Sequence, residues 1–324
     1  MLNIRRLGLS DKHSIREIIN ANGDGGDLKY PLLKELFCNA QSLLPLKYKF
    51  LPETFVCTKN GKLTGVISVK ATRGNPEVIS ILQLIFKNND YETGKELINF
   101  VVEYFGYLGA KTFKVVIDNN DKDLENLFIN ACGFRCGSWE NLWNISAGIE
   151  RFKSIQTSNF VQMNDGLAQD VADLINAELQ SYYKPALEKT ADEFKSPLLE
   201  VFNNFHGNSF VKLLNGKVSA YLSIQTADNV NYTLTPYINS GYSITYDEII
   251  GFAVNNIMRH RLSKFNIYLC QQKNLKFAED LEEYLHSNKY DCVDTKHVLV
   301  KEFYKPIKQE FKSFIFSENG AFAK

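Results

Sequence analysis

The stretches FVCTKNGKLTGVIS (Phe55–Ser68) and FVKLLNGKVSAYLS (Phe210–Ser223) are two copies of one pattern, and this pattern decides the fold. In each copy, alternating apolar residues lead into Asn-Gly and then into a second alternating run. Asn-Gly is the strongest short signal for a β-hairpin, because both turn residues must adopt positive φ angles. The sequence therefore predicts hairpins that turn at Asn60-Gly61 and at Asn215-Gly216.

The similarity continues upstream of both hairpins. KYPLLKELF, which starts at Lys29, resembles KSPLLEVF, which starts at Lys195. Both segments predict a helix with Pro in its first turn, where the missing N–H is not needed. Before them, IRRLGLSDKHSIREIIN resembles FVQMNDGLAQDVADLIN, and each predicts a short strand followed by a helix.

The similarity also continues downstream. TGKELINFVVEYF at Thr93 resembles TYDEIIGFAVNNIM at Thr245, and the buried strands FKVVIDNN and FNIYLCQQ follow, each before a further helix. Such an internal repeat predicts two copies of one supersecondary arrangement. We expect an α/β fold with two tandem domains, each a twisted mixed sheet flanked by helices. Their expected ranges are 1–148 and 155–303, with a tail at 304–324 that packs on a domain through its Phe residues.

Composition excludes several classes of protein. The 324 residues carry 37 basic and 37 acidic side chains, so the net charge is zero and no basic run is present. Nucleic-acid binding proteins usually show a basic surplus, so no nucleic-acid partner is expected. No apolar stretch reaches the roughly 18 residues of a membrane span, and the N-terminus lacks the apolar core of a signal peptide. We expect a cytoplasmic protein with no membrane partner.

The cysteines and histidines do not form a metal-binding pattern. Six cysteines are scattered along the chain, and the five histidines show neither HxxxH nor HExxH spacing. Because metal sites usually show such spacing, no metal is expected. The scatter also does not indicate a disulfide framework.

The order of elements, the two hairpins and the segment VVIDNNDKDLENLFINACGFR (Val115–Arg135) together resemble the GNAT (GCN5-related N-acetyltransferase) fold, twice over nearly the whole chain. In that family, a loop of the form Q/R-x-x-G-x-G/A joins the fourth strand to a helix and holds the pyrophosphate of coenzyme A. The corresponding stretch here is Asn89 to Gly94. Gly94 matches the last glycine of the family motif, whereas Glu92 replaces its first glycine and Asn89 replaces Gln or Arg.

Both copies of this stretch also have a plain structural interpretation. Thr93-Gly-Lys-Glu96 and Thr245-Tyr-Asp-Glu248 match the capping box that starts many helices. A capped helix start can still face a phosphate, because its free N–H groups and dipole favour an anion. The first copy is preferred as the coenzyme A loop since it keeps Gly94 and adds Lys95, although SGYS (residues 240–243) in the second half is an alternative.

The resemblance also implies a cofactor groove between two strands that splay apart. It places the cofactor contacts at the following residues: Leu84, Ile85, Phe86, Asn89, Thr93, Gly94, Lys95 and Asn120. Asn119 or Asn120 matches a family Asn that contacts the cofactor. The family often has a general-acid Tyr in the next helix, but the position is Phe128 or Ile129 here, so that acid is missing.

Acyl transfer to an amine needs donors for the developing oxyanion and a proton acceptor for the amine. The catalytic candidates are Gln83, Asp90 and Asn119; Asn88, Glu92 and Asp118 are further polar residues beside them. Gln83 interrupts the apolar run ISILQLIF, and a polar residue there needs a partner or a ligand. A satisfied structural role for Gln83 is the alternative.

Acceptor-binding candidates come from other segments. ANGDGGD (residues 21–27) is acidic and lacks the GKS/T ending of a phosphate loop, so it is either a connector or a lid whose Asp24 and Asp27 attract a cationic amine. Tyr242, and Tyr182 with Tyr183, are aromatic candidates for lining an acceptor cleft between the halves.

The resemblance implies an acyl-CoA-dependent N-acyltransferase with acetyl-CoA or hydroxybutyryl-CoA as co-substrate. Among tandem GNAT proteins, the chain is most similar to those that acylate nucleotide-linked amino sugars, which suggests a dTDP-linked dideoxyamino sugar as the acceptor. A mycothiol-synthase-like acetyltransferase and a non-catalytic binding protein are alternatives. An aminoacyl-tRNA-dependent transferase is disfavoured because no basic arm is present to neutralise phosphates.

Overall fold

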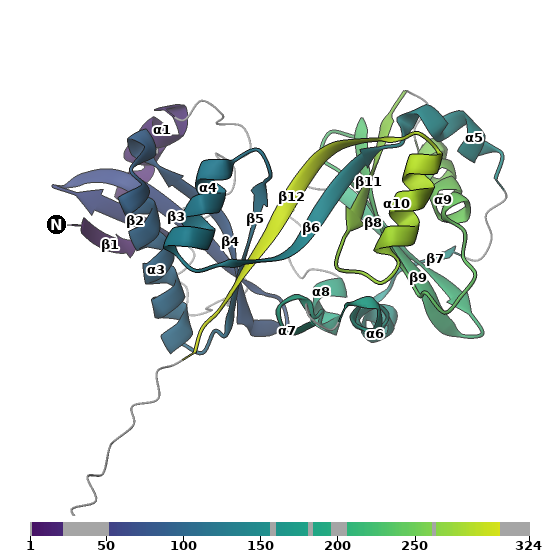
Figure 1. The fold of residues 1–324 in the computed structure, drawn as a ribbon, viewed down its shortest axis with the longest axis horizontal. Helices are drawn as coiled ribbons and strands as arrows, with labels where there is room; N and C mark the ends of the chain where they lie inside the picture. The colour runs from purple at the N-terminus through teal and green to yellow at the C-terminus, as the bar shows by residue number, and fades with distance from the viewer. Residues whose placement is uncertain are drawn as a thin grey trace, which may run out of the picture.

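A computed structural model describes residues 2–21, 52–155, 160–180, 184–195, 206–260 and 264–304. Across these residues runs one sheet of twelve strands, in the order β1-β2-β3-β4-β5-β12-β6-β11-β10-β9-β8-β7 (Figure 1). It contains both parallel and antiparallel pairs, and helices pack against it. The mixed α/β class predicted from the sequence is confirmed.

The first half of the chain contributes six strands and four helices to the described fold. Its elements are β1 (Leu2–Arg6), α1 (Lys12–Ala21), β2 (Glu53–Lys59), β3 (Lys62–Thr72), β4 (Asn75–Phe86), α3 (Tyr91–Tyr107), β5 (Thr112–Asp118), α4 (Lys122–Asn126), β6 (Arg135–Asn144) and α5 (Ile149–Lys153). One π-helical turn, Leu127–Ala131, follows α4.

The second half repeats this order within the described residues. Its elements are β7 (Phe160–Gln162), α6 (Ala168–Glu178), α7 (Lys184–Leu187), α8 (Ala191–Phe194), β8 (His206–Leu214), β9 (Lys217–Thr226), β10 (Asn231–Ile238), α9 (Tyr246–His260), β11 (Asn266–Gln272), α10 (Ala278–Ser287) and β12 (Asp291–Glu302). The predicted helices at 29–37 and 196–202 and the tail at 305–324 lie outside the described residues.

Both predicted hairpins are confirmed. Asn60 and Gly61 have φ angles of 53° and 76°, and Asn215 and Gly216 have 51° and 76°. Positive φ at both turn residues matches the right-handed twist of the flanking strands, which is why Asn-Gly occurs here. Each turn joins directly paired strands, β2 to β3 and β8 to β9.

The two halves exchange their last strands. β12, from the second half, lies between β5 and β6 and is antiparallel to both. β6, from the first half, lies between β12 and β11. Figure 1 shows β6 and β12 side by side across the middle of the molecule. The predicted ranges therefore mark two repeats in the sequence, while in space each repeat gives a strand to the sheet of the other.

The exchange is held by apolar burial on both sides. Leu299 of β12 is fully buried in the first-half core, among residues of β5 and α3. Trp143 of β6 is 2% exposed and lies in the second-half core, where its indole N–H donates to Gln271 Oε1 at 3.0 Å. Burying side chains of this size stabilises a fold by about 2–3 kcal/mol each, so the halves do not separate without a large loss of stability.

Candidate active site

The first-half sheet contains a gap between two parallel strands. β4 and β5 pair from Val78–Thr112 to Ile81–Val115, and no pair joins them beyond that point in the described residues. β4 nevertheless continues to Phe86, paired with β3 on its other side, and β5 continues to Asp118, paired with β12. The β4–β3 register shifts at Leu82, which marks a β-bulge that bends the strand. The two strands thus diverge as the sequence resemblance predicted.

The predicted cofactor contacts on β4 can offer only their backbone groups to this gap. Leu84 and Phe86 pack against the first-half core. Ile85 is 4% exposed and packs in the cluster that includes α1. With their side chains committed to apolar packing, these residues present a strand edge that no described residue pairs with, and such an edge binds extended amide chains.

Gln83, predicted to be catalytic, carries an unsatisfied polar atom in this part of β4. It pairs in register with Ser68 on β3, whose hydroxyl is already bonded to Thr54 at 2.6 Å. The side-chain oxygen Oε1 of Gln83 is buried and has no hydrogen-bond partner among the residues that the structure describes. A buried acceptor without a donor costs about 1–3 kcal/mol. The simplest resolution is an N–H group that a ligand brings into the gap.

The start of α3 differs from the capping box predicted at Thr93. The helix begins at Tyr91, and its N-cap is Asp90, whose carboxylate accepts from the Thr93 backbone N–H at 3.2 Å and from its hydroxyl at 2.9 Å. Thr93 is fully buried against the sheet. The Thr93 hydroxyl and the cation of Lys59 lower the pKa of Asp90. Asp90, predicted as a catalytic residue, is therefore a weak base that serves the helix end.

The remaining loop residues are placed as follows. Asn88 and Asn89 both have φ angles of 53°, so the chain turns sharply before α3. A Cβ on Gly94 would lie 2.8 Å from Phe86 Cε1 and 3.0 Å from Leu127, so this glycine permits close packing of helix on strand. Lys95 is exposed, and the Glu92 side chain is 73% exposed with its carboxylate 3.9 Å from Lys59 Nζ. Glu92 thus points toward solvent.

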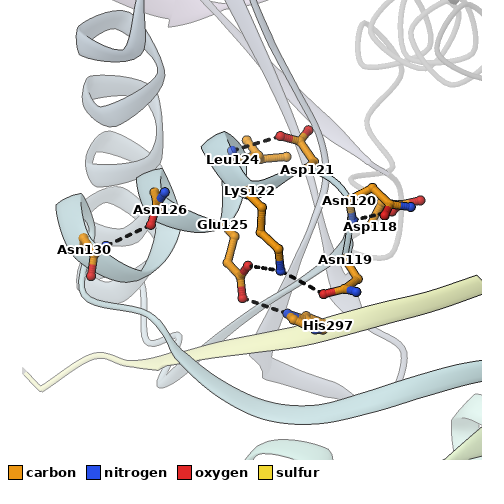
Figure 2. A network of polar contacts seen from close by, with 10 residues as sticks. All are labelled: Asp118, Asn119, Asn120, Asp121, Lys122, Leu124, Glu125, Asn126, Asn130 and His297. Carbon is orange, nitrogen blue, oxygen red and sulfur yellow. Dashed lines mark hydrogen bonds and ion pairs between the residues drawn. The ribbon is translucent and has the colours of Figure 1, made fainter.

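Figure 2 shows the turn after β5, where Asn119 and Asn120 lie. Asn119 Oδ1 accepts from Lys122 Nζ at 2.9 Å, and the Asn119 backbone N–H donates to Thr295 of β12 at 2.9 Å. The Asn120 backbone N–H donates to Asp118 Oδ1 at 2.7 Å. The turn is therefore held in part by the second half of the chain.

The same network contains a histidine that sequence reasoning missed. His297 of β12 contacts Glu125 Oε1 through Nδ1 at 2.8 Å, and Glu125 Oε2 also accepts from Lys122 Nζ at 3.0 Å. These contacts lower the pKa of Glu125, the lysine contributing most. His297 comes from the opposite half, so no local signal in the sequence places it beside β5. Phe128, at the expected position of the general acid, is fully buried against Phe134.

Lys114 is a second residue that sequence reasoning missed. It lies on β5, where it pairs with Ser80 on β4, immediately before the gap opens. Burial lowers its pKa to about 8, and the nearby cation of Lys189 adds to this effect. A lone Lys within the apolar run FKVVID was the available signal. Among the described residues, no group of three or more His, Cys, Asp or Glu side chains could hold a metal ion.

The second half has an equivalent gap, but protein atoms close it. β10 and β11 pair from Asn231–Asn266 to Leu234–Leu269 and then diverge. Tyr237, 6% exposed, donates its hydroxyl to Gln272 Oε1 at 3.1 Å across the gap. The chain after α6 also fills it, because Leu179 forms a bridge with Leu275.

The loop after β10 likewise has its N–H groups occupied. Ser240 N–H donates to Glu178 Oε1 at 3.1 Å, and Gly241 N–H donates to Asn239 Oδ1 at 2.9 Å. The Tyr242 N–H donates to the Asn239 carbonyl at 3.1 Å. A carboxylate thus stands where a phosphate would bind. Of the capping box predicted at Thr245, the hydroxyl half is confirmed, since Thr245 Oγ1 accepts from the Glu248 N–H at 3.3 Å. The Glu248 carboxylate accepts from Lys212 Nζ at 2.5 Å.

The predicted acceptor residues are not brought together with the first-half gap by the described structure. Tyr242 follows β10, and four strands separate β10 from β4 in the sheet. Asp24, Asp27, Tyr182 and Tyr183 lie outside the described residues. No helix in the described ranges is long and apolar enough to cross a membrane.

Comparisons with known proteins agree with this geometry at the level of the fold. No family model and no curated protein matches the sequence. Among solved structures, a tandem GNAT protein from the clavulanic acid biosynthesis pathway has a TM-score of 0.59 at 11% identity, covering 93% of this chain and 98% of its own.

Two further solved structures extend the likeness over the same share of the chain. A GCN5-related N-acetyltransferase from Sphaerobacter thermophilus has a TM-score of 0.53 at 10% identity, covering 93% of this chain and 95% of its own. A probable N-acyltransferase from Enterococcus faecalis V583 has a TM-score of 0.54 at 8% identity, covering 93% of this chain and 72% of its own. The chain therefore has the fold of tandem GNAT proteins, with both halves included in the likeness.

Proposed function

We propose that the protein is an acyl-CoA-dependent N-acyltransferase in which the first-half gap receives the acyl-pantetheine arm. The observation that carries this proposal is the edge of β4 from Leu82 to Phe86, which faces the end of β5 and pairs with no strand on that side within the described ranges. The arm contains amide groups, which pair with a free strand edge as a further strand would. The unpartnered Oε1 of Gln83 supplies an acceptor for one N–H at the same place.

The chemistry follows from these groups. Acyl-CoA supplies the thioester carbonyl, the acceptor nitrogen forms a bond to that carbon, and the carbon–sulfur bond breaks. Backbone N–H groups on the free edge of β4 stabilise the negative charge that develops on the carbonyl oxygen. The nitrogen must lose a proton, and water serves as its acceptor because Asp90 is held as a helix cap with a lowered pKa. The leaving thiolate takes up a proton from solvent or from the amine.

The second half supports the fold and holds no second acyl-CoA in this proposal. Its gap is crossed by Tyr237 and Leu179, and its loop N–H groups are occupied by Glu178 and Asn239. We therefore expect one molecule of coenzyme A per chain.

A non-catalytic binding protein is the second candidate, and one observation favours it. The carboxylate of Asp90 lies at the N-terminus of α3, where the resemblance places the pyrophosphate, and Lys59 is 3.7 Å away. For an acyltransferase to bind the pyrophosphate here, the positive charge of the lysines near the start of α3 must exceed the negative charge of the Asp90 carboxylate. The two candidates differ in turnover, since only the enzyme releases free thiol.

The acceptor in this proposal is a small-molecule amine. A dTDP-linked dideoxyamino sugar as the acceptor, and acetyl or hydroxybutyryl as the acyl group, are finer hypotheses. They rest on the sequence resemblance and are tested with the set of amines described below.

The proposal is tested first by calorimetric titration of the full chain with coenzyme A, and then by thiol release. We expect one binding site per chain and thiol release from acetyl-CoA or hydroxybutyryl-CoA when a matching amine is present. The panel contains dTDP-linked amino sugars and simple mono- and diamines. Failure to bind coenzyme A at millimolar concentration contradicts the proposal; binding without thiol release for any amine favours the non-catalytic protein.

A further inference from the structure

A polar pocket of about 550 Å³ lies where the two halves meet. Residues of both halves line it, from β6, β12, β11, β10 and the end of β9 with its turn: Glu140, Asn141, Leu142, Asp294, Lys296, Cys270, Asn231, Thr233, Gln225, Thr226, Ala227 and Asp228. The volume is that of a small-molecule site. Because β6 and β12 are the exchanged strands, the pocket exists only in the joined molecule.

The pocket begins beside the proposed acyl site. In the strand register, Asp118 at the end of β5 is paired with Lys296, and Lys296 is paired with Glu140. Residues paired in this way lie on the same face of a sheet. Glu140 is therefore two strand spacings, roughly 10 Å, from β5, and the gap opens on the far side of β5. A ligand of that length reaches both places along one face.

The charges of the lining favour a cation. Lys296 is the only basic residue of the lining, and its Nζ lies 3.6 Å from Asp294. The Asp228 carboxylate is already bonded within its own turn, where Oδ1 accepts from the backbone N–H groups of Val230 and Asn231 at 2.8 Å each. Glu140 has no ion-pair partner within 4 Å among the described residues, and burial raises its pKa although three lysines lie in its surroundings. Its carboxylate lacks the close cation that a buried charge requires.

The equivalent place in the first half is filled by a segment of the second half. The turn between β3 and β4 corresponds to the turn between β9 and β10. There, Thr190 donates its hydroxyl to the Arg73 carbonyl at 2.9 Å, and a Cβ on Gly74 would lie 2.6 Å from Asp192 Cβ. The segment with α7 and α8 thus packs against the β3–β4 turn. Figure 1 draws both helices below the centre of the sheet. The described residues leave the other site open.

We propose that this pocket holds the far end of the amine acceptor, and that Glu140 binds a second ammonium group of that acceptor about two strand spacings from the reacting nitrogen. The proposal rests on the proposed acyl transfer and narrows its substrate class to diamines and related cations. A nucleotide diphosphate would bring two negative charges toward Glu140 and Asp294, which opposes binding. The amide and hydroxyl groups of Gln225, Asn231 and Thr233 suit a hydrophilic body between the two nitrogens.

The test compares 1,8-diaminooctane with octylamine, which has the same carbon chain but no second ammonium. Both are titrated calorimetrically into the full chain without coenzyme A. We expect the diamine to bind at least tenfold more tightly than octylamine, and Glu140→Gln to abolish this preference. Glu150→Gln is the matched control, because the Glu150 side chain is 83% exposed on α5 and should leave the preference intact. Melting temperatures establish that each variant is folded.

A second variant keeps the inference testable if Glu140→Gln fails to fold. Asp294→Asn removes a second carboxylate of the lining, the one besides Glu140 that does not bond within its own turn as Asp228 does, and should reduce the preference for the diamine about threefold. Equal affinity for the two amines, a preference that survives Glu140→Gln, or tighter binding of a dTDP-linked amino sugar than of the diamine would each overturn the inference. The coenzyme A titration of the unaltered protein is a separate measurement that tests only the proposed function. Diamine binding without coenzyme A binding therefore contradicts the proposed function alone, and the reverse contradicts this inference alone.

Discussion

Among the described residues, the first-half and second-half gaps have the same strand geometry but different contents. In both halves, four residue pairs join the parallel strands before they diverge. In the first half, a buried oxygen of Gln83 is left without a partner beside the gap. In the second half, Tyr237 reaches Gln272 across the gap, and Leu179 pairs with Leu275. The repeated backbone thus contains two gaps, and in the proposed function the described side chains leave only the first for coenzyme A.

The comparison also indicates why the proposed function does not place a phosphate at the second-half loop. Glu178 is 3% exposed and accepts through Oε1 from the N–H and hydroxyl of Ser240, while its Oε2 has no partner in the described part of the chain. A carboxylate in such a loop takes up the donors that an anion needs and repels the anion as well. Asp90 has a similar role in the first half, but its partner there is the third residue of the helix, Thr93.

The largest expected effect comes from filling the first gap. Val116 follows the last β4–β5 pair and is 49% exposed, so Trp is tolerated there and its indole lies beside the gap. We expect Val116→Trp to weaken coenzyme A binding at least a thousandfold, about 4 kcal/mol, in calorimetry. Val161→Trp, at a 42% exposed position on β7, should bind normally. Normal binding by Val116→Trp would remove the gap as the site.

The next effect concerns the closed gap. Tyr237 is 6% exposed, and Tyr237→Ala removes a buried ring together with its hydrogen bond. We expect the free energy of unfolding to fall by about 3–4 kcal/mol in urea titrations. Tyr107→Ala, at a 63% exposed ring, should change it by less than about 0.5 kcal/mol. The coenzyme A stoichiometry should remain one, because Glu178 still occupies the loop; a value of two would show that the ring alone closes the second site.

Lys114 provides a third test of the two gaps, because it lies on β5 beside the first-half gap. Its pKa in the folded protein is about 8, below the ordinary 10.5, so between these pH values only the unfolded state holds the proton. Stability should therefore rise with pH across this window, and the full penalty, on the order of 3 kcal/mol, applies below pH 8.

Replacing the lysine isolates that penalty. Lys114→Met should raise the free energy of unfolding at pH 7 on the order of 3 kcal/mol, and the gain should shrink between pH 8 and 10.5. Lys111→Met is the control, since its side chain is 68% exposed and its ion pair with Glu77 is on the surface. A gain that is independent of pH would mean that packing, rather than the buried charge, accounts for the difference.

The smallest expected effect tests the unpartnered oxygen. Gln83→Leu removes a buried acceptor that lacks a donor, so the protein without ligand should become more stable by about 1–2 kcal/mol in thermal or urea unfolding. The same change should weaken coenzyme A binding, because the ligand loses its acceptor. A loss of stability in Gln83→Leu would instead assign Gln83 a structural role.

Local signals in the sequence succeeded where one residue type controls one backbone geometry. The Asn-Gly turns were predictable because few other dipeptides accept two positive φ angles. The Thr245 cap was predictable for a similar reason. The prediction failed at Thr93 because Asp90, three residues earlier, caps equally well and the methyl group of Thr93 packs above Gly65.

The sequence by itself determined the repeat, the order of elements and the fold class, because hydrophobic periodicity and turn chemistry act over a few residues. Only the tertiary structure decided that β6 and β12 change places, since either strand satisfies the same edge of the sheet. That exchange brings His297 to Glu125 and Glu140 to Lys296. The site between the halves therefore depends on contacts across more than a hundred residues of chain, which local patterns do not encode.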